Sequence, residues 1–461
     1  MRRADREFRL ADLRHVHADA AAAAITTGDP ARAVELLEQA RGVLLVDELD
    51  ARAGSLALRD RAPHLAAEWD AVLEELADES QSTDDRRALS QQWQDVLDRI
   101  RAIPGLQAFL YPPSALDLRV TDGAVVLVNV SLWRCDALLI TPEGVHAKKL
   151  RHLTFDEVQD RTGAYLAALD ALEGGDLVAR FDAQAVVRET LSWLWKTVAR
   201  PVLKALGHTR PPRGAWPRVW WCPTGALTNL PLHAAGRHDV PGEAVLDHVV
   251  SSYTPTARTL SHTRSRPPTT RRDLLAVAMP ATPDHADLPA TDAEATDLAA
   301  LLDAAEPLRG PAATRAAVLA ALPNATWAHF ACHAHSDPLV PSAGHLLLAD
   351  GALTVADIGA LRLEQAELAY LSACSTARAA HTTPDEVITL ASAFQLAGFR
   401  HVIGALWPIQ DVVAARVAAA FHRHVHAGTP PAEALHHVLR ELRAEFPLAV
   451  SQWAGYVHVG S

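Results

Sequence analysis

From residue 218 onward, the chain is a series of short apolar runs separated mostly by segments with helical character. The runs are "RVWWCP", "HVVSSYTP", "DLLAVAMP", "ATWAHFAC", "AELAYLSAC" and "RHVIGALWP". Short apolar strands that alternate with helices are typical of a mostly parallel sheet that is buried on both faces. The sequence therefore predicts an α/β fold in which helices flank a mostly parallel sheet.

Residues 1–104 have a different pattern, which predicts an all-α module. In "TGDPARAVELLEQARGVLL", Asp29 is placed to cap a helix and Pro30 to occupy its first turn. Two apolar stripes with helical spacing follow. The first contains Val34, Leu37 and Leu44, and the second contains Leu89, Trp93, Val96 and Ile100 at intervals of three or four residues. Paired amphipathic helices of this kind resemble the last units of a tetratricopeptide array. The alternative is a helical packing module without a binding role.

Residues 105–461 form the predicted α/β domain, which we divide into a first half, 105–262, and a second half, 274–461. In the first half, "GAVVLVNVSL" and "DALLITPEGVHA" have the pattern of hairpin strands, and helices are expected near 155–175 and 185–206. The connecting segment 263–273, "TRSRPPTTRRD", is basic and rich in proline, so we expect an exposed loop. A cleavable linker between the two halves is the alternative for this segment.

Composition excludes several classes of protein. A formal net charge of -12 argues against a nucleic-acid partner, because neutralising phosphates requires clustered Lys and Arg. The four cysteines are widely spread and form no CxxC pair, so neither a disulfide framework nor a zinc ribbon is predicted. The sequence has no run of about 18 apolar residues, and no apolar segment follows its basic beginning. We therefore expect a cytoplasmic protein that is neither secreted nor embedded in a membrane.

A histidine and a cysteine follow two of the predicted strands. His333 comes after "ATWAHFAC" and Cys374 ends "AELAYLSAC". Reactive groups gather at the carboxyl ends of parallel strands, so the two side chains would meet at one edge if the strands are neighbours. A thiol beside an imidazole is the arrangement of a nucleophile and its base. Small and polar residues after each position suit loops that wall a cleft.

Two other interpretations of these residues stay open from the pattern alone. Cysteine is among the most buried residue types, so Cys374 can simply fill space at the end of a strand. Alternatively, His329, His333, His335 and Asp337 could hold a metal ion. Against the metal site, His329 and His333 run along a strand into a turn and do not share a helical face.

Several motifs in order resemble the CHAT family of caspase-like cysteine peptidases, to which separase and gingipain are related. They are "WWCPTGALTNLPLHAAG", "SSYTPTARTL", "HFACHAHSDPLVPSAGHLLLADGALTVADI", "LAYLSACSTARAAHTTPDEVITLASAFQLAGFRHVIGALWPIQD" and "WAGYVHVG". The resemblance covers about residues 100–461. It implies a caspase-like fold and a regulated endopeptidase that cleaves specific protein targets, in bacterial defence or programmed cell death. Helical repeats before the peptidase domain are also usual in that family, and they imply a regulatory protein partner.

The resemblance also implies roles for single residues. His333 and Cys374 would form the catalytic dyad, with no metal or organic cofactor. Backbone N–H groups of Cys374 and of Ala334, the residue after the histidine, would hold the oxyanion. The family usually has glycine where this chain has Ala334, and glycine permits a positive φ. A catalytically weak or inactive CHAT-like scaffold that binds a protein partner is therefore the alternative function.

Two acidic residues are candidates for binding substrate. Asp385 lies in "TTPDEV", where Thr383 and Glu386 have the spacing of a capping box at the start of a helix. Asp411 lies in "LWPIQDVVAARV", where a helix N-cap is also expected. Related peptidases that cut after basic residues have an acidic group after a similar strand and tryptophan. Asp411 is accordingly predicted as the floor of a pocket for a basic side chain, with Asp385 as a second substrate-binding candidate.

Overall fold

The computed structural model describes residues 15–42, 45, 58–77, 83–107, 109–110, 114–337, 340–379, 384–386 and 388–461. Its central feature is an eleven-stranded sheet with the strand order β3-β2-β1-β4-β5-β14-β13-β12-β8-β6-β7. These strands are β1 Gly123–Val130, β2 Cys135–Thr141, β3 Gly144–Lys149, β4 Arg218–Pro223, β5 Val250–Tyr253, β6 Leu274–Ala278, β7 Leu308–Arg309, β8 Trp327–Ala331, β12 Leu368–Ser372, β13 His401–Ala405 and β14 Tyr456–Gly460. A small second sheet contains β9 Ala334–His335, β10 His345–Leu348 and β11 Gly351–Thr354.

The large sheet consists of two parallel blocks that meet in one antiparallel pair. Strands β1, β4, β5 and β14 are parallel to one another, and so are β13, β12, β8, β6 and β7. The two blocks join where β13 pairs antiparallel with β14, and the hairpins of β2 and β3 extend one edge. All six apolar runs named in the sequence analysis contain strands of this sheet. The predicted mostly parallel α/β fold is therefore confirmed.

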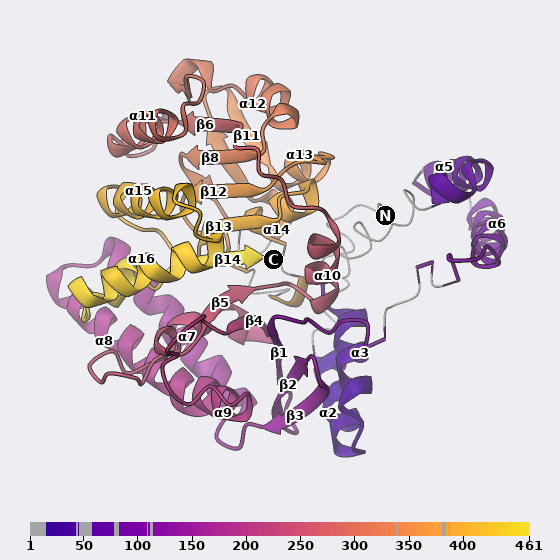
Figure 1. Ribbon diagram of the computed structural model, residues 1–461, viewed down its shortest axis with the longest axis horizontal. Coiled ribbons are helices and arrows are strands. Elements are labelled where there is room, and N and C mark those ends of the chain that lie inside the picture. Colours follow the sequence, from indigo (N-terminus) through magenta and orange to yellow (C-terminus); the bar gives the residue numbers. More distant parts are fainter. Residues whose placement is uncertain are drawn as a thin grey trace.

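Helices cover both faces of the sheet (Figure 1). They are α7 Phe155–Gly174, α8 Leu177–Leu194, α9 Arg200–Ala205, α10 Ala257–Ser265, α11 Ala290–Leu302, α12 Arg315–Ala321, α13 Val355–Gly359, α14 Leu390–Ala397, α15 Asp411–His426 and α16 Pro431–Glu445. Consecutive residues of β8 show the two faces. Phe330 packs against Phe394 of α14, whereas His329 contacts Glu294 of α11 and His422 of α15. Because both faces are covered, β8 is apolar nearly throughout and does not alternate.

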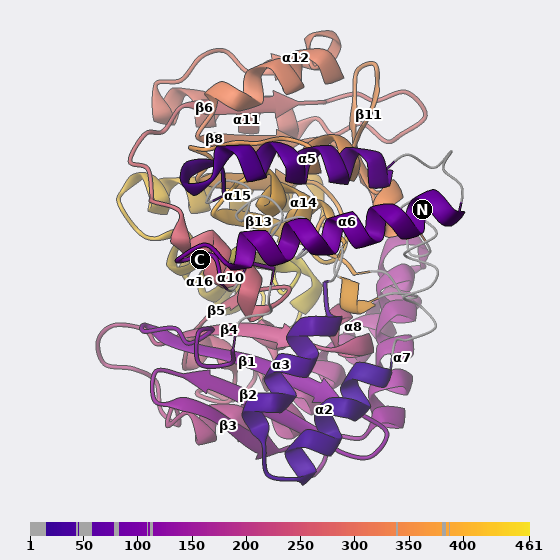
Figure 2. The same cartoon turned by 90° about the vertical axis from the view of Figure 1, so that its right-hand side faces the viewer.

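The N-terminal helices form two pairs with different environments. Helices α2 Val16–Thr26 and α3 Pro30–Ala40 share a core with the sheet, in which Leu37 packs with Val125 and Trp220. Helices α5 Pro63–Ala77 and α6 Thr83–Arg101 have a separate core. They lie apart from the sheet in Figure 1 and in front of it in the turned view of Figure 2. Helices α2 and α3 lie before the predicted boundary between residues 104 and 105, and the sheet on which they pack lies after it. The boundary therefore divides elements that share a core. Only the α5–α6 pair has a core of its own.

Local predictions in these regions can be compared with the structure. The Asp29 side chain accepts a hydrogen bond from Arg32 N–H and Pro30 opens α3, as expected, whereas Leu44 lies outside the described residues. The segment 263–273 begins inside α10 and continues as a largely exposed loop. That loop is nevertheless anchored, because the Arg266 guanidinium donates to the carbonyls of Leu363 and Gly398. Within the described ranges, no helix has both the length and the apolar character needed to cross a bilayer.

Candidate active site

His333 and Cys374 follow neighbouring strands at the same edge of the sheet. Strands β8 and β12 are parallel, and their last residues, Ala331 and Ser372, are paired in register. His333 and Cys374 each lie two residues beyond that pair. Both side chains are partly exposed. The structure therefore places His333 and Cys374 at equivalent positions after neighbouring strands, and their roles as base and nucleophile stay a prediction.

The turn that carries Cys374 is fixed to the neighbouring strand β13. Thr376 is fully buried, and its hydroxyl accepts a hydrogen bond of 3.0 Å from Ala405 N–H. Gly404 makes room for this contact, since a Cβ at that position would lie 2.9 Å from Thr376 Oγ1. Ser375, directly after the cysteine, has a φ of 53°. A non-glycine residue in this left-handed region is strained, and such strain is concentrated at functional sites.

The imidazole of His333 is oriented by a main-chain carbonyl. His333 Nε2 lies 2.8 Å from the Ala286 carbonyl oxygen, and the ring of His285 lies 5.0 Å away. A carbonyl can only accept a hydrogen bond, so Nε2 carries the proton in this contact. In the neutral ring, Nδ1 is then the nitrogen that can accept a proton. This arrangement is suited to a base whose orientation is fixed by its second nitrogen.

The thiol of Cys374 is held in its protonated form. Burial raises its pKa, Glu173 raises it further by its negative charge, and a backbone hydrogen bond from Ile409 partly offsets both effects. Among the described residues no hydrogen bond joins Cys374 to His333, and the backbone N–H of Cys374 also has no partner there. The N–H is thus available to an oxyanion, whereas the thiol itself is not yet activated.

Ala334 adopts ordinary extended backbone. It belongs to β9, where it pairs with Leu346 of β10, and it is not among the described non-glycine residues with positive φ. The backbone at position 334 therefore does not need the conformational freedom of the glycine that the family usually has there. The left-handed residue of this site is Ser375, which the sequence pattern did not single out.

Asp385 is buried where the segment after Cys374 contacts the first helices of the chain. Its Oδ1 accepts hydrogen bonds from Arg41 Nε at 2.9 Å and from Gly225 N–H at 3.0 Å, and its Oδ2 lies 3.1 Å from His17 Nε2. Burial alone would raise the pKa of this carboxyl, but the His17 hydrogen bond and the Arg41 charge lower it on balance. Both oxygens are used internally. Residues 384–386 form a short 3₁₀ turn, and Thr383 of the predicted capping box lies outside the described residues.

Asp411 is the first residue of α15, and the N-cap position belongs to Gln410, one residue earlier than expected. The Asp411 carboxylate instead accepts a hydrogen bond of 2.8 Å from Ala290 N–H, at the start of α11. The carboxylate therefore accepts a hydrogen bond from an N–H group in the first turn of a neighbouring helix, where N–H groups have no acceptor within the helix. The predicted substrate-binding role of Asp411 stays a prediction, and this geometry favours a structural role.

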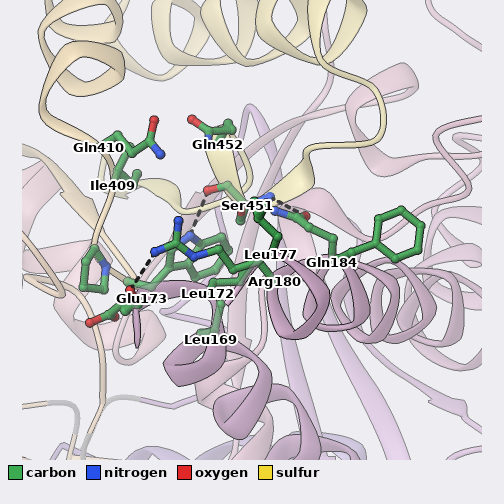
Figure 3. A pocket seen from close by; sticks show the side chains of 13 residues that line it. Leu169, Leu172, Glu173, Leu177, Arg180, Gln184, Ile409, Gln410, Ser451 and Gln452 are labelled. Atoms are coloured by element: carbon green, nitrogen blue, oxygen red, sulfur yellow. Dashed lines mark hydrogen bonds between the residues drawn. The ribbon is translucent and has the colours of Figure 1, made fainter. Parts of the chain in front are cut away.

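A pocket of about 560 Å³ is lined by Ile409 and Glu173, which both act on Cys374, and includes neither acidic candidate. Its walls come from α7, α8, the loop after β13 and residues 451–452, and they include Leu169, Glu173, Leu177, Phe181, Trp407 and Ile409. Figure 3 shows Ile409 and Gln410 on one side of this pocket and Leu169 on the other. Sequence reasoning missed Glu173 because it ends a helix far from both motifs. The only available signal was "ALWPIQD", which contains Trp407 and Ile409 next to the predicted Asp411.

The residues proposed as alternative metal ligands are dispersed. His329 is buried, with Nε2 2.9 Å from Glu294 Oε1 and Nδ1 3.2 Å from His422 Nε2. His333 faces the Ala286 carbonyl, and His335 packs on His345. In the part of the chain that the structure describes, no three His, Cys, Asp or Glu residues are grouped to hold a metal ion.

Comparisons with known proteins agree with this geometry. The CHAT domain model matches residues 188–461, which is more than half of the chain. Two crystal structures of Saccharomyces cerevisiae separase in complex with securin are similar to this chain. The TM-scores are 0.53 and 0.52 at 10% and 11% identity, over 88% and 95% of this chain and 33% and 38% of the separase chain. This chain thus spans about a third of the length of separase.

A third structure, the Arg-specific cysteine proteinase gingipain R, matches with a TM-score of 0.38 and 10% identity, over 60% of this chain and 67% of that chain. Comparison with curated proteins gives no match. The family match covers both strands that carry His333 and Cys374, and the separase likeness extends over nearly the whole fold. The chain belongs to the CHAT-domain family and has a caspase-like fold.

Proposed function

We propose that this protein is a regulated cysteine endopeptidase in which Cys374 is the nucleophile and His333 the general base. The observation that carries the proposal is the equivalent placement of the two residues after paired parallel strands, with His333 Nε2 fixed by the Ala286 carbonyl. Placement of reacting groups by rigid strands is what nucleophilic catalysis requires. Its substrates are protein segments, and the family resemblance implies a role in defence or programmed cell death.

The reaction follows from these positions. Nδ1 of His333 takes the thiol proton, and Cys374 Sγ attacks the carbonyl carbon of the substrate. The resulting oxyanion accepts a hydrogen bond from the N–H of Cys374, with Ala334 N–H as the second donor. The C–N bond then breaks, and His333 returns the proton to the leaving amine. Water hydrolyses the thioester and releases the new carboxyl terminus.

The protonated thiol supports regulation. Burial raises the Cys374 pKa, and no hydrogen bond to His333 offsets that effect in the described structure. The dyad must therefore close before the first step. Helices α2 and α3 contact the segment after Cys374 through Asp385, and α5–α6 stand apart as a surface for a regulatory protein partner.

The same features favour one alternative, a scaffold in which the cleft holds a peptide without cleaving it. One experiment distinguishes the peptidase from the scaffold. The purified protein is incubated with a proteome, and new N-termini are identified by mass spectrometry for the wild type, Cys374→Ala, His333→Ala and the control Cys135→Ala. The peptidase predicts new N-termini with wild type and control that are absent with both dyad variants. A wild-type profile identical to that of Cys374→Ala would support the scaffold.

A further inference from the structure

The pocket beside Cys374 has an unusually apolar mouth. Leu177, Val178 and Phe181 lie within the first turns of α8 and are 85%, 70% and 71% exposed. Leu177 and Phe181 line the pocket. Single exposed apolar residues are ordinary on a protein surface, but a cluster of large ones around a cavity is typical of a binding site.

The interior of the pocket is preformed. Trp407 is almost fully buried, and its indole N–H donates a hydrogen bond of 3.0 Å to the Ser451 carbonyl. Gly455 allows this close packing, because a Cβ there would lie 2.9 Å from the Trp407 ring. Tyr165 makes an edge contact with the same ring. Together with the buried Leu169, Trp407 gives the pocket a rigid apolar wall.

Two residues that line the pocket also act on the candidate nucleophile. Ile409 lines it and also supplies the backbone hydrogen bond to Cys374, and Glu173 lines it and acts on Cys374 by its charge. A side chain bound here would therefore belong to a substrate residue close to the attacked carbonyl.

The charged groups at this pocket do not select one sign of charge. Glu173 and Arg180 both line it and both are exposed. Arg180 donates to the Glu173 main-chain carbonyl at 3.2 Å (Figure 3). A charged substrate side chain would lose its hydration against Leu169 and Trp407, and no single charged group of the pocket would compensate for that loss. An apolar side chain would instead be stabilised by burial.

We propose that this pocket binds a bulky apolar or aromatic side chain of the substrate next to the cleaved bond. The inference rests on the proposed peptidase function, but it names a substrate class that the dyad does not determine. Leu177 and Phe181 on one wall, and Trp407 and Ile409 on the other, are the residues that recognise this side chain.

The test uses peptidyl chloromethyl ketones, in which chloride is displaced by the Cys374 sulfur. Reagents of one scaffold carry Phe, Leu, Arg or Asp at the residue beside the ketone, and labelling of Cys374 is followed by mass spectrometry. Apolar pockets typically discriminate by 10-fold or more, so the Phe and Leu reagents should label at least about 10-fold faster than the Asp reagent. Equal rates for all four reagents, or fastest labelling by the Arg or Asp reagent, would refute the pocket assignment.

Matched variants separate recognition from folding. Leu177→Ser with Phe181→Ser changes exposed residues only, and should reduce the Phe preference to about 2-fold or less while iodoacetamide labels Cys374 at an unchanged rate. Leu132→Ser with Trp133→Ser, which are 59% and 80% exposed on another surface, should leave the preference intact. An undiminished preference in the pocket variant would overturn the assignment.

The outcomes also distinguish the two proposals. A preference for the Phe reagent without cleavage of any protein would support the pocket assignment and contradict the peptidase function. Cleavage of proteins without a side-chain preference would support the peptidase function and contradict the pocket assignment.

Discussion

Arg41 Nε lies 2.9 Å from Asp385 Oδ1, and both side chains are buried. Asp385 belongs to the segment between Cys374 and α14, whereas Arg41 directly follows α3. Gly42 N–H also donates to the Asp385 carbonyl, at 2.8 Å. The first helices of the chain are therefore fastened to the segment that follows the nucleophile.

Breaking this pair should reduce stability strongly. Removing one partner of a buried ion pair typically costs about 3–5 kcal/mol, because the other charge stays buried. We expect Asp385→Asn to lower the free energy of unfolding in urea by an amount in this range. The control is Asp70→Asn, which removes the partner of Arg59 in an exposed pair and should cost about 1 kcal/mol or less. Similar losses in the two variants would contradict the role of the buried pair.

The Asp385 carboxylate should also make the free energy of unfolding decrease in acid. The Asp385 pKa is lower in the folded protein than the unfolded value of about 4. The folded state thus binds fewer protons, so this stabilisation is present above about pH 4 and is lost as the pH falls through the folded pKa. Urea unfolding between pH 5 and the acid limit should show a smaller decline for Asp385→Asn than for the wild type.

Gly404 should be required for the position of Cys374. In Gly404→Ala, the new Cβ would meet Thr376 Oγ1 at 2.9 Å and displace the turn. A small misplacement of a reacting group can cost about 10- to 100-fold, so we expect a cleavage rate lower by that factor with the fold retained in circular dichroism. Gly163→Ala is the control, because its helical site has open space, and it should leave the rate unchanged. An active Gly404→Ala would show that the turn tolerates the shift.

The isolated protein should have a weakly reactive nucleophile. Burial raises the Cys374 pKa above its ordinary value of about 9. Its iodoacetamide labelling rate should therefore still increase above about pH 9, since only the thiolate reacts. His333→Ala should change that profile little, because no hydrogen bond joins the two residues in the described structure. A plateau reached below pH 8 in the wild type, and lost in His333→Ala, would mean that the ion pair is already formed.

Asp411→Asn should preserve substrate preference. The asparagine oxygen can still accept the hydrogen bond from Ala290 N–H, so the loss of stability should be about 1 kcal/mol or less. Asp411 is also absent from the lining of the pocket beside Cys374. Cleavage-site profiles should thus be the same for the variant and the wild type. A selective loss of cleavage after arginine would restore the basic-pocket prediction made from the sequence.

The parts of the structure that the sequence predicted well depend on local pattern. Short apolar runs predicted the strands, and the order of the runs placed His333 and Cys374 after two strands that prove to be neighbours. The amphipathic stripes of α3 and α6 are alike, yet Leu37 packs on the sheet and Ile100 packs within its own helical pair. Periodicity shows that a face is buried, but it does not say against what.

The contacts that sequence reasoning missed join distant segments. Asp385 has the local signature of a turn, and nothing near it indicates Arg41 and His17 as partners. Glu173 similarly acts on Cys374 by its charge because α7 and the loop after β13 line the same pocket. Such contacts depend on how distant segments pack together, and no local pattern in a single sequence indicates which residues will meet.

The central claim is that Cys374 forms an acyl thioester with the substrate. Once a cleaved protein has been identified, the reaction is repeated with hydroxylamine, which competes with water for the thioester. The new C-termini should then carry hydroxamate, and Cys374→Ala should yield neither cleavage nor hydroxamate. Cleavage that gives only free carboxylate in hydroxylamine and persists in Cys374→Ala would contradict the account.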